Sequence, residues 1–435
     1  MTYNEFKEKL FSIAKEKGFE AQIDLSESSE FSLRYANDDI DQYTDASKFS
    51  VSIKILKDGK IGRVYTEQLE NPEKLFEEAL KNWELTDSED EEFFYDGTGK
   101  YIEMDLYNGS FEKTSVSEKI EFVKKLYNSA KCDDRIVMVP YAMYNNFKVS
   151  KKISNTLGLD VSTTADGGYS YAMAVSKDES THSGLWMEVG TKFSDLDPEK
   201  IGKTACQNAL SLLGAKSVKS GKYRVIIKNT AFEDMLSLLI SMISAENVQK
   251  NMSPLKGKQN QKIASTILNI KDVPYYKNSI SNRPFDDEGV PTKETPIIEN
   301  GILKSFLYDL KTAKKDNTEP TGNSLGGSIR PINLLVESGE YDFENLLKKL
   351  DDGIVIIGVD GMHSGANPIS GNFSLGARGF RVINGEISHP IEQITISGNF
   401  LQLFEKVEAV GNDSKIFYGI ITPSILISEL DIAGE

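Results

Sequence analysis

The sequence has few of the residues that build covalent cross-links and metal centres. Its 435 residues include two cysteines, Cys132 and Cys206, and three histidines, His182, His363 and His389. Two cysteines exclude a disulfide framework, and their spacing matches no zinc knuckle. We therefore expect both to be reduced thiols that pack as small hydrophobic side chains. No histidine has another histidine four or five residues away, so no zinc site with two imidazoles on one helix is encoded.

The three histidines differ in their surroundings. His182 and His389 lie in strand-like segments, where we expect a surface or hydrogen-bonded structural role. His363 lies in a glycine-rich loop, which makes a functional role a more reasonable hypothesis. The motifs of several common enzyme classes are missing as well. The sequence contains no Gly-x-Ser-x-Gly elbow, no Walker loop and no Gly-x-Gly-x-x-Gly.

Long hydrophobic runs and excess positive charge are also absent. The longest apolar run, residues 235–245, is interrupted by serines and is too short to span a membrane. Residues 1–11 lack the basic and apolar regions of a signal peptide. The net charge of −16 disfavours nucleic acid or an anionic membrane surface as the main partner. We therefore expect a cytoplasmic protein that binds neither.

The length and composition predict a large folded protein. With 39% hydrophobic and 27% charged residues, the chain has the balance of a globular protein, and 435 residues exceed one ordinary core. We predict an α+β fold with two domains. The first is an α+β domain over residues 1–220 with antiparallel sheets flanked by helices, and the second is a β-rich domain over residues 221–435.

The pattern in the first half of the sequence predicts the same order of elements twice. In each copy a helix is followed by several antiparallel strands and a second helix, which suggests a duplicated unit. Capping-box pairs, Thr2 with Glu5 and Ser115 with Glu118, start the first helix of each copy. The acidic stretch between the copies, residues 84–99, is interpreted as a solvated connection. The predicted helix, strand and helix segments are residues 3–17, 21–66 and 72–83, then 116–130, 135–190 and 198–214.

The second half is dominated by turns. Asn300-Gly301 and Asn384-Gly385 each predict a β-hairpin, because both central residues of a type I′ turn need positive φ. An apolar helix is expected over residues 231–248, and short helices over residues 343–350 and 400–409. Between the hairpins, many glycines indicate backbone that turns tightly or approaches another group closely.

A carboxylate cluster is the best acid–base candidate in the sequence. Asp286, Asp287 and Glu288 lie between Pro284 and Pro291, which favours a rigid loop. Two interpretations stay open at this point. The carboxylates carry out proton transfer, or the aspartates bond their own backbone in a turn.

Taken together, the motifs of the second half resemble those of the TldD/PmbA family. The resemblance is strong over residues 221–435 and weaker before them. Many motifs in the same order make a chance match improbable. The segments that carry it are FDDEGVP (285–291), TPIIENG (295–301), FLYD (306–309), TGN (321–323), NP (367–368), SGNFSLGA (370–377), NGE (384–386), ITISGN (394–399) and VGND (410–413).

The family resemblance implies a function in proteolysis. The family pairs two related subunits in a peptidase that trims or degrades extended peptides. The TldD-type subunit carries zinc on a His-Glu-x-x-x-His helix and a later cysteine, which the PmbA/TldE type lacks. In this chain the corresponding helix, residues 231–248, contains no histidine, and no cysteine follows Cys206. The chain thus resembles a PmbA/TldE-type subunit with no catalytic residue or metal of its own, in a heterodimer whose TldD-type partner holds the zinc.

On this interpretation some loop residues face the peptide or the partner subunit. A homodimer is possible as well as a heterodimer. Two alternative functions remain. One is a self-sufficient homodimeric hydrolase that uses Asp287 and Glu288 with a captured metal. The other is a regulatory binding protein, in line with an older description of the family as modulators of DNA gyrase. The six candidate peptide- or partner-facing residues are Asp286, Asp287, Glu288, Asn323, His363 and Asn367.

Overall fold

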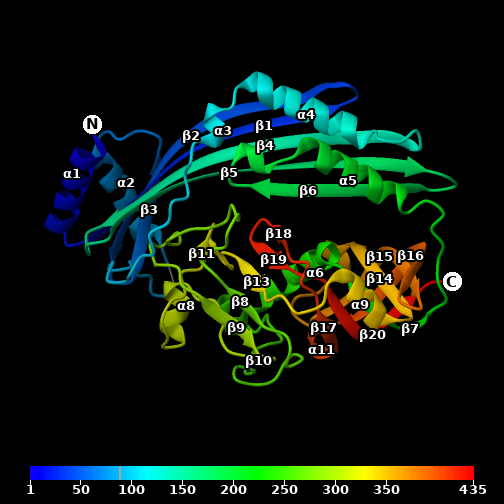
Figure 1. Ribbon diagram of the computed structural model, residues 1–435. Coiled ribbons are helices and arrows are strands. Elements are labelled where there is room, and N and C mark those ends of the chain that lie inside the picture. The colour runs from blue at the N-terminus through cyan, green and yellow to red at the C-terminus, as the bar shows by residue number, and fades with distance from the viewer. Residues whose placement is uncertain (88–89) are drawn as a thin grey trace.

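The computed structural model describes residues 1–87 and 90–435. A long curved sheet lies over a more compact C-terminal part, and helices α4 and α5 cover the outer face of the sheet (Figure 1). Within the described residues its strand order is β3-β2-β1-β4-β5-β6, with all neighbours antiparallel. Its strands are β1 (Glu20–Ala36), β2 (Asp39–Lys57), β3 (Lys60–Thr66), β4 (Ile136–Asn155), β5 (Asp160–Lys177) and β6 (Thr181–Gly190).

Two similar units build this sheet, as the sequence predicts. The element order α1-β1-β2-β3-α2 is repeated as α4-β4-β5-β6-α5, and the strand order is symmetric about the β1–β4 pair. The predicted capping boxes of Thr2 with Glu5 and Ser115 with Glu118 are both present. The helices are α1 (Tyr3–Glu16), α2 (Pro72–Leu85), α3 (Ser110–Lys113), α4 (Val116–Ala130) and α5 (Pro198–Leu210), with a 3-10 turn at Phe193–Asp195.

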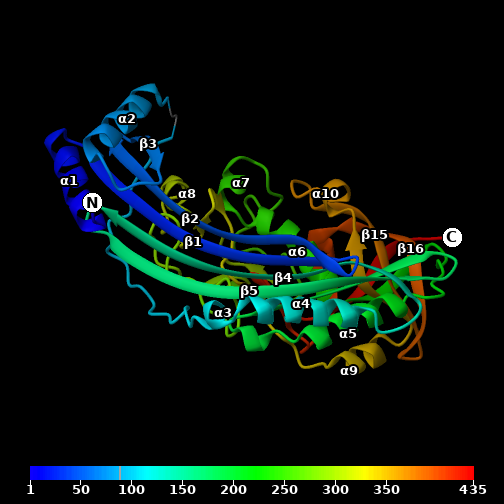
Figure 2. The same ribbon diagram turned by 90° about the horizontal axis from the view of Figure 1, so that it is seen from above.

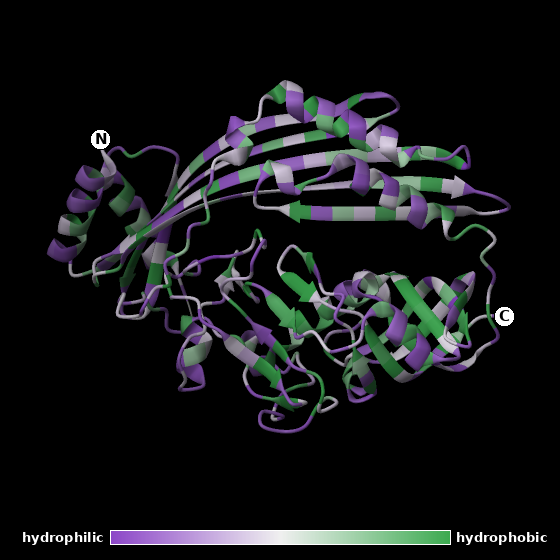
Figure 3. Ribbon diagram, viewed as in Figure 1, coloured by the Kyte–Doolittle hydropathy of each residue, from purple (hydrophilic) through white to green (hydrophobic). Residues whose placement is uncertain are grey.

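Each helix pair buries its own core against the sheet. Helices α1 and α2 cover a cluster that includes Phe6, Ile53 and Phe76, whereas α4 and α5 cover one that includes Leu126 and Tyr144. In Figure 3 the long strands alternate between hydrophilic and hydrophobic residues, which is the period-2 pattern of a sheet with two different faces. The strands of the C-terminal part are more uniformly hydrophobic in the same view.

The prediction of reduced cysteines is wrong in this structure. Cys132 and Cys206 form a disulfide with their Cα atoms 6.2 Å apart, within the range that a disulfide spans. Cys132 follows the end of α4 and Cys206 lies on α5, and these helices lie side by side on the sheet (Figure 2). The cysteines are 74 residues apart, so no local pattern indicates the pairing.

The C-terminal part contains two further large sheets and a short hairpin, β11–β12. One sheet has the order β10-β9-β8-β13-β19-β18, and the other has the order β16-β15-β14-β7-β20-β17, in which β16 also pairs with β20. The α+β class is therefore confirmed. Their strands are β7 (Gly221–Ile227), β8 (Ile270–Asp272), β9 (Thr295–Glu299), β10 (Ile302–Leu303), β11 (Ser324–Leu325), β12 (Ser328–Ile329), β13 (Leu334–Val336), β14 (Gly353–Asp360), β15 (Asn372–Ile383), β16 (Glu386–Asn399), β17 (Val407–Val410), β18 (Lys415–Phe417), β19 (Ile420–Thr422) and β20 (Ile425–Ala433).

Two of the helices predicted in the C-terminal part end earlier than expected. The helix expected over residues 231–248 breaks at Ile243 and Ser244, where the backbone bonds to Leu307 in a strand-like manner instead. The helix expected to reach residue 409 ends sooner, because the chain then pairs with β20 as β17. The helices of this part are α6 (Asn229–Met242), α7 (Ala245–Gln249), α8 (Leu310–Lys315), α9 (Phe343–Leu350), α10 (Met362–Gly365) and α11 (Phe400–Glu405).

Both Asn-Gly hairpins are confirmed. Asn300 and Gly301 have φ values of 50° and 77°, and they join β9 to β10. Asn384 and Gly385 have φ values of 52° and 75°, and they join β15 to β16. Asparagine and glycine are the residues that adopt these angles at least cost.

The acidic connection between the two units contacts the C-terminal part. Residues 88–89 of the predicted solvated stretch lie outside the described residues. In the described remainder, Asp90 pairs with Lys315 at 2.6 Å and with Lys311 at 3.1 Å. Glu91 and Glu92 also lie within 4 Å of lysines of α8. These surface ion pairs attach the connection to α8.

No helix in the described part of the chain has the length and apolar character needed to cross a membrane.

Candidate functional site

The carboxylate loop of residues 284–291 forms a tight turn. Asp286 is 0% exposed, and its Oδ1 accepts hydrogen bonds from the backbone N–H groups of Glu288 and Val290 at 2.9 and 3.0 Å. Its Oδ2 accepts a third N–H, from Ser324, at 2.9 Å. Of the two interpretations left open above, the structure shows the turn in which an aspartate bonds its own backbone.

Burial governs the protonation of two acids in this loop. It raises the pKa of Asp286 well above the ordinary aspartate value, although the three N–H bonds oppose part of the rise. Burial also raises the pKa of Glu288, and repulsion from Asp286 raises it further. Glu288 is half-buried, and its Oε2 accepts the N–H of Leu310 at 2.9 Å, where α8 begins. A carboxylate there interacts favourably with the positive end of the helix dipole.

Asp287 attaches this loop to the long sheet. Its carboxylate forms ion pairs with Lys151 of β4 and, at 3.4 Å, with Arg283. Burial alone raises the pKa of Asp287, but Lys151, the N–H of Gly326 and the charge of Arg283 together hold it below its ordinary value. Nearby, the Tyr101 hydroxyl donates to the Gly289 carbonyl at 2.8 Å. The loop thus joins the two parts of the molecule.

Asn323 belongs to a buried hydrogen-bond network. It is 0% exposed, and its Nδ2 donates to Asp272 Oδ2 at 2.7 Å and to the Arg330 carbonyl at 3.1 Å. The other oxygen of Asp272 accepts the N–H groups of Ile332 and Asn333. The network joins the end of β8 to the segments around Asn323 and Asn333. Like Asp286, Asn323 does not reach the surface of the chain.

His363 and Asn367 lie in a different place. They belong to the segment between β14 and β15 that includes α10, and both are exposed. Asn367 Oδ1 accepts the N–H groups of Ile369 and Ser370 at 2.9 and 3.2 Å, so this side chain shapes its own turn. Figure 2 shows α10 well separated from α8, next to which the carboxylate loop lies. The structure does not bring the two predicted loops together.

A second set of residues, which the sequence patterns did not single out, lines a cavity of about 400 Å³. The cavity lies between β6 and α5 of the long sheet on one side and α6, β14, β15 and β18 on the other. Its charged lining residues are Lys228, Glu233, Asp234, Arg378 and Lys415.

Burial also shifts the protonation of the charged groups in this cavity. It raises the pKa of Glu233 to about 7 and that of Asp234 to about 6, because each carboxylate loses hydration. It lowers the pKa of Lys415 to about 7 for the same reason. The Nζ of Lys415 lies 3.1 Å from the centre of the Trp186 ring, a cation–π contact. The adjacent pair Glu233-Asp234 on an otherwise apolar helix is a sequence signal that could have drawn attention to this cavity.

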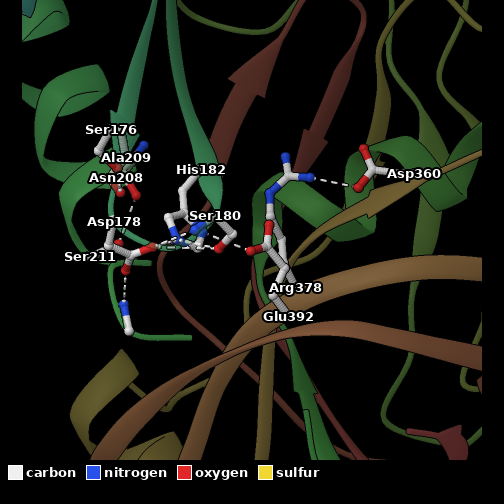
Figure 4. Close-up of polar contacts among 11 residues, drawn as sticks. Ser176, Asp178, Ser180, His182, Asn208, Ala209, Ser211, Asp360, Arg378 and Glu392 are labelled. Carbon is white, nitrogen blue, oxygen red and sulfur yellow. Dashed lines mark hydrogen bonds and ion pairs between the residues drawn. The ribbon is translucent and has the colours of Figure 1, made fainter. Parts of the chain in front are cut away.

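A histidine beside this cavity joins the two parts of the molecule. His182 of β6 is buried, as expected for a hydrogen-bonded structural histidine. Its Nδ1 lies 2.7 Å from Glu392 Oε2 on β16, and its Nε2 lies 3.1 Å from Asp178 Oδ1 (Figure 4). Figure 4 also shows Arg378, whose Nη1 donates to Asp360 at 2.7 Å. The imidazole therefore has an acidic neighbour at each ring nitrogen.

The exposed face of α6 does not fit a catalytic zinc ion. Asp234, Ser237 and Ser241 lie on its accessible side, and serine hydroxyls are not among the usual zinc ligands. Even with the neighbouring Glu233, the helix offers two carboxylates, which leaves one of the three protein ligands of such a site unfilled. Elsewhere in residues 1–87 and 90–435, no three histidine, cysteine or acidic side chains are grouped as metal ligands.

Three consecutive segments match profiles of known domains. Residues 21–82 match PmbA/TldA metallopeptidase domain 1, residues 109–213 match the central domain, and residues 220–434 match the C-terminal domain. Among curated proteins, the chain is 30% identical over 343 residues to a metalloprotease PmbA homolog of Buchnera aphidicola. That match covers 77% of this chain and 74% of the relative.

Solved structures of similar proteins cover the whole fold. A Thermotoga maritima protein described as a candidate modulator of a DNA gyrase is 53% identical, with a TM-score of 0.97 over 99% of this chain and 100% of that chain. TldE from Thermococcus kodakarensis is 26% identical, with a TM-score of 0.90 over 99% of this chain and 100% of that chain. This chain therefore belongs to the PmbA/TldD family of metallopeptidases.

Proposed function

We propose that this chain is a PmbA/TldE-type subunit, the partner without the metal in a two-subunit peptidase that acts on extended peptides. The observation that carries the proposal is helix α6. It contains no histidine, and its accessible side offers two adjacent carboxylates and two serines where a zinc peptidase needs three ligands. The similarity to TldE from Thermococcus kodakarensis supports the same assignment.

In this proposal the chain shapes a peptide cavity that a TldD-type subunit completes. The partner supplies the zinc and the activated water, and this chain supplies a rigid wall and strand edges that hold peptide backbone. Of the six residues expected at the peptide or the partner, the exposed His363 and Asn367 are the ones that we place there. We assign Asp286, Asp287, Glu288 and Asn323 to joining the loops and the two parts of the chain. We also place the complex in the cytoplasm.

The test is a purification of the tagged chain from its native cell. We expect it to recover a relative that carries the His-Glu-x-x-x-His helix. We also expect cleavage of an unfolded peptide by the recovered pair and none by this chain alone. If such a relative is consistently missing, the proposal is wrong.

Metal analysis of the isolated chain separates the proposal from its first alternative. A self-sufficient homodimeric hydrolase predicts one bound zinc per chain together with peptidase activity. Our proposal predicts neither, and the zinc should follow the partner subunit during purification.

A regulatory role is the second alternative, favoured by the description of the Thermotoga maritima relative as a candidate gyrase modulator. A direct role on DNA predicts salt-sensitive DNA binding at physiological ionic strength. The net charge of −16 argues against such binding. An electrophoretic mobility assay with the purified chain is the measurement, and we expect no shifted band.

A further inference from the structure

The cavity beside β6 borders an open strand edge. β6 is the last strand of the long sheet, and within the described residues it pairs only with β5. The Leu185 carbonyl accepts the side chain of Asn208 at 3.0 Å, so it points away from β5. Since main-chain groups alternate in direction along a strand, those of Ser183 and Met187 point the same way. All three strand residues line the cavity.

The same cavity holds charged groups that have no counter-charge in contact. Among the described residues, Lys228, Lys415, Glu233 and Asp234 form no ion pair within 4 Å. The two lysines lie over aromatic rings instead, Lys228 over Phe343 and Lys415 over Trp186. The pKa of Glu233 responds to Lys415, so opposite charges lie within electrostatic range without touching. Lys228, Glu233 and Lys415 are partly buried, and charges of this kind are stabilised by a ligand that pairs with them.

Much of the remaining lining is apolar, beside polar side chains such as Gln207 and Asn208, and the space is small. Leu185, Trp186 and Met187 line one side, and Phe380 and Phe417 line the other. A volume of about 400 Å³ is in the range of sites for small molecules, about 300–1,000 Å³. It accommodates a peptide of about two or three residues and excludes a folded domain.

We propose that this cavity binds a short zwitterionic peptide along the edge of β6. The N-terminal ammonium pairs with Glu233 and Asp234, and the C-terminal carboxylate pairs with Lys228 and Lys415. The main chain bonds to the outward groups of Ser183 and Met187, since the Leu185 carbonyl already accepts Asn208, and apolar side chains lie against the aromatic lining. The biological meaning rests on the proposed function, since a peptidase releases such peptides, but the binding itself is a separate property of this chain.

Calorimetric titration of the isolated chain with Ala-Leu-Ala tests the proposal. The probe is used with both termini free, with an acetylated N-terminus, with an amidated C-terminus, and with both ends blocked. We expect the free peptide to bind, and each single block to weaken binding about tenfold or more, as the loss of a charged hydrogen bond implies. Equal affinity for free and doubly blocked peptides, or no binding of the free peptide, would overturn the proposal.

Variants assign each end of the peptide to its side chains. Lys415→Met should bind the free and the amidated peptides equally well, and Glu233→Gln should bind the free and the acetylated peptides equally well. Lys125→Met, on the exposed face of α4, is the matched control and should behave as the unmodified chain. Far-ultraviolet circular dichroism establishes that each variant is folded. If both cavity variants keep the full preference for free termini, the cavity is not the site.

The outcome is independent of the proposed function. If the chain binds free peptides but recovers no TldD-type partner, this inference stands and the proposed function fails. If it recovers that partner but binds no free peptide, the proposed function stands and this inference fails.

Discussion

The imidazole of His182 and the carboxylate of Glu392 meet at 2.7 Å, and this contact joins β6 of the long sheet to β16 of the C-terminal part. The two residues are 210 positions apart. Because the histidine is buried, its hydrogen bonds are protected from competing water. The contact is therefore expected to contribute more to stability than the exposed ion pairs of the surface.

Glu392→Gln tests this contact. We expect the substitution to lower the free energy of unfolding by about 1–3 kcal/mol, because a charge-assisted hydrogen bond of a buried group is weakened. Urea denaturation followed by fluorescence measures the change. Glu386→Gln, an exposed position on the same strand, is the control and should change stability little. Equal effects of the two substitutions would contradict the expectation.

The ion pair of Lys151 with Asp287 is another contact that joins the two parts of the molecule. We expect Lys151→Met and Asp287→Asn each to destabilise the protein by about 1–2 kcal/mol, since both groups are only partly buried. The double variant should lose less unfolding free energy than the two single variants lose together. The difference, the coupling energy of a double-mutant cycle, should be about 0.5–3 kcal/mol. Strict additivity of the two changes would show that the residues do not stabilise each other.

The half-buried carboxylate of Glu233 makes stability depend on pH. Its pKa rises from 4.5 to about 7 in the folded protein, so the folded state binds the proton more tightly than the unfolded state. The stability that the tighter proton binding contributes is fully present below about pH 4.5 and is lost as the pH rises through 7. Glu233→Gln should therefore gain stability relative to the unmodified chain between pH 5 and pH 8.

Urea denaturation at these two pH values measures the effect of Glu233→Gln. Glu344→Gln, exposed on α9, serves as the control and should show no such trend. A difference in unfolding free energy that stays constant from pH 5 to pH 8 would rule out a raised pKa for Glu233.

The disulfide between Cys132 and Cys206 provides a further test. Reduction should lower the free energy of unfolding by about 2–4 kcal/mol, because a cross-link over 74 residues restricts the unfolded chain. Denaturation with and without reductant measures this. A Cys206→Ser variant should match the reduced protein and should no longer respond to reductant. Two titratable thiols in the purified, unreduced protein would instead restore the prediction made from the sequence.

Local features of the fold could be read from the sequence because their causes are local. The capping boxes at Thr2 and Ser115 and the turns at Asn300 and Asn384 depend on side chains and angles within a few residues. Tertiary contacts decided the rest. The break in the apolar helix near Ser244 depends on Leu307, more than sixty residues away in the chain.

The candidate site was predictable only in part, for the same reason. The sequence identified the motif of Asp286 but not the backbone groups of Ser324 that surround it. The cavity beside β6 collects Trp186, Glu233 and Lys415 from three distant elements, and nothing in their local patterns relates them. The family resemblance rested on the order of the motifs, which can be read from the sequence without any tertiary contact. It was confirmed.

The two cores of the long sheet have a consequence for how the molecule opens. Helices α1 and α2 cover one apolar cluster, and α4 and α5 cover a second, which also includes Phe31 and Leu33 of β1. Each cluster can therefore be the centre of a cooperative subunit of folding with its own opening free energy. Amide hydrogen exchange should then divide the sheet into two blocks. The block that contains β6 should exchange more slowly, because it is also fastened to the C-terminal part through His182.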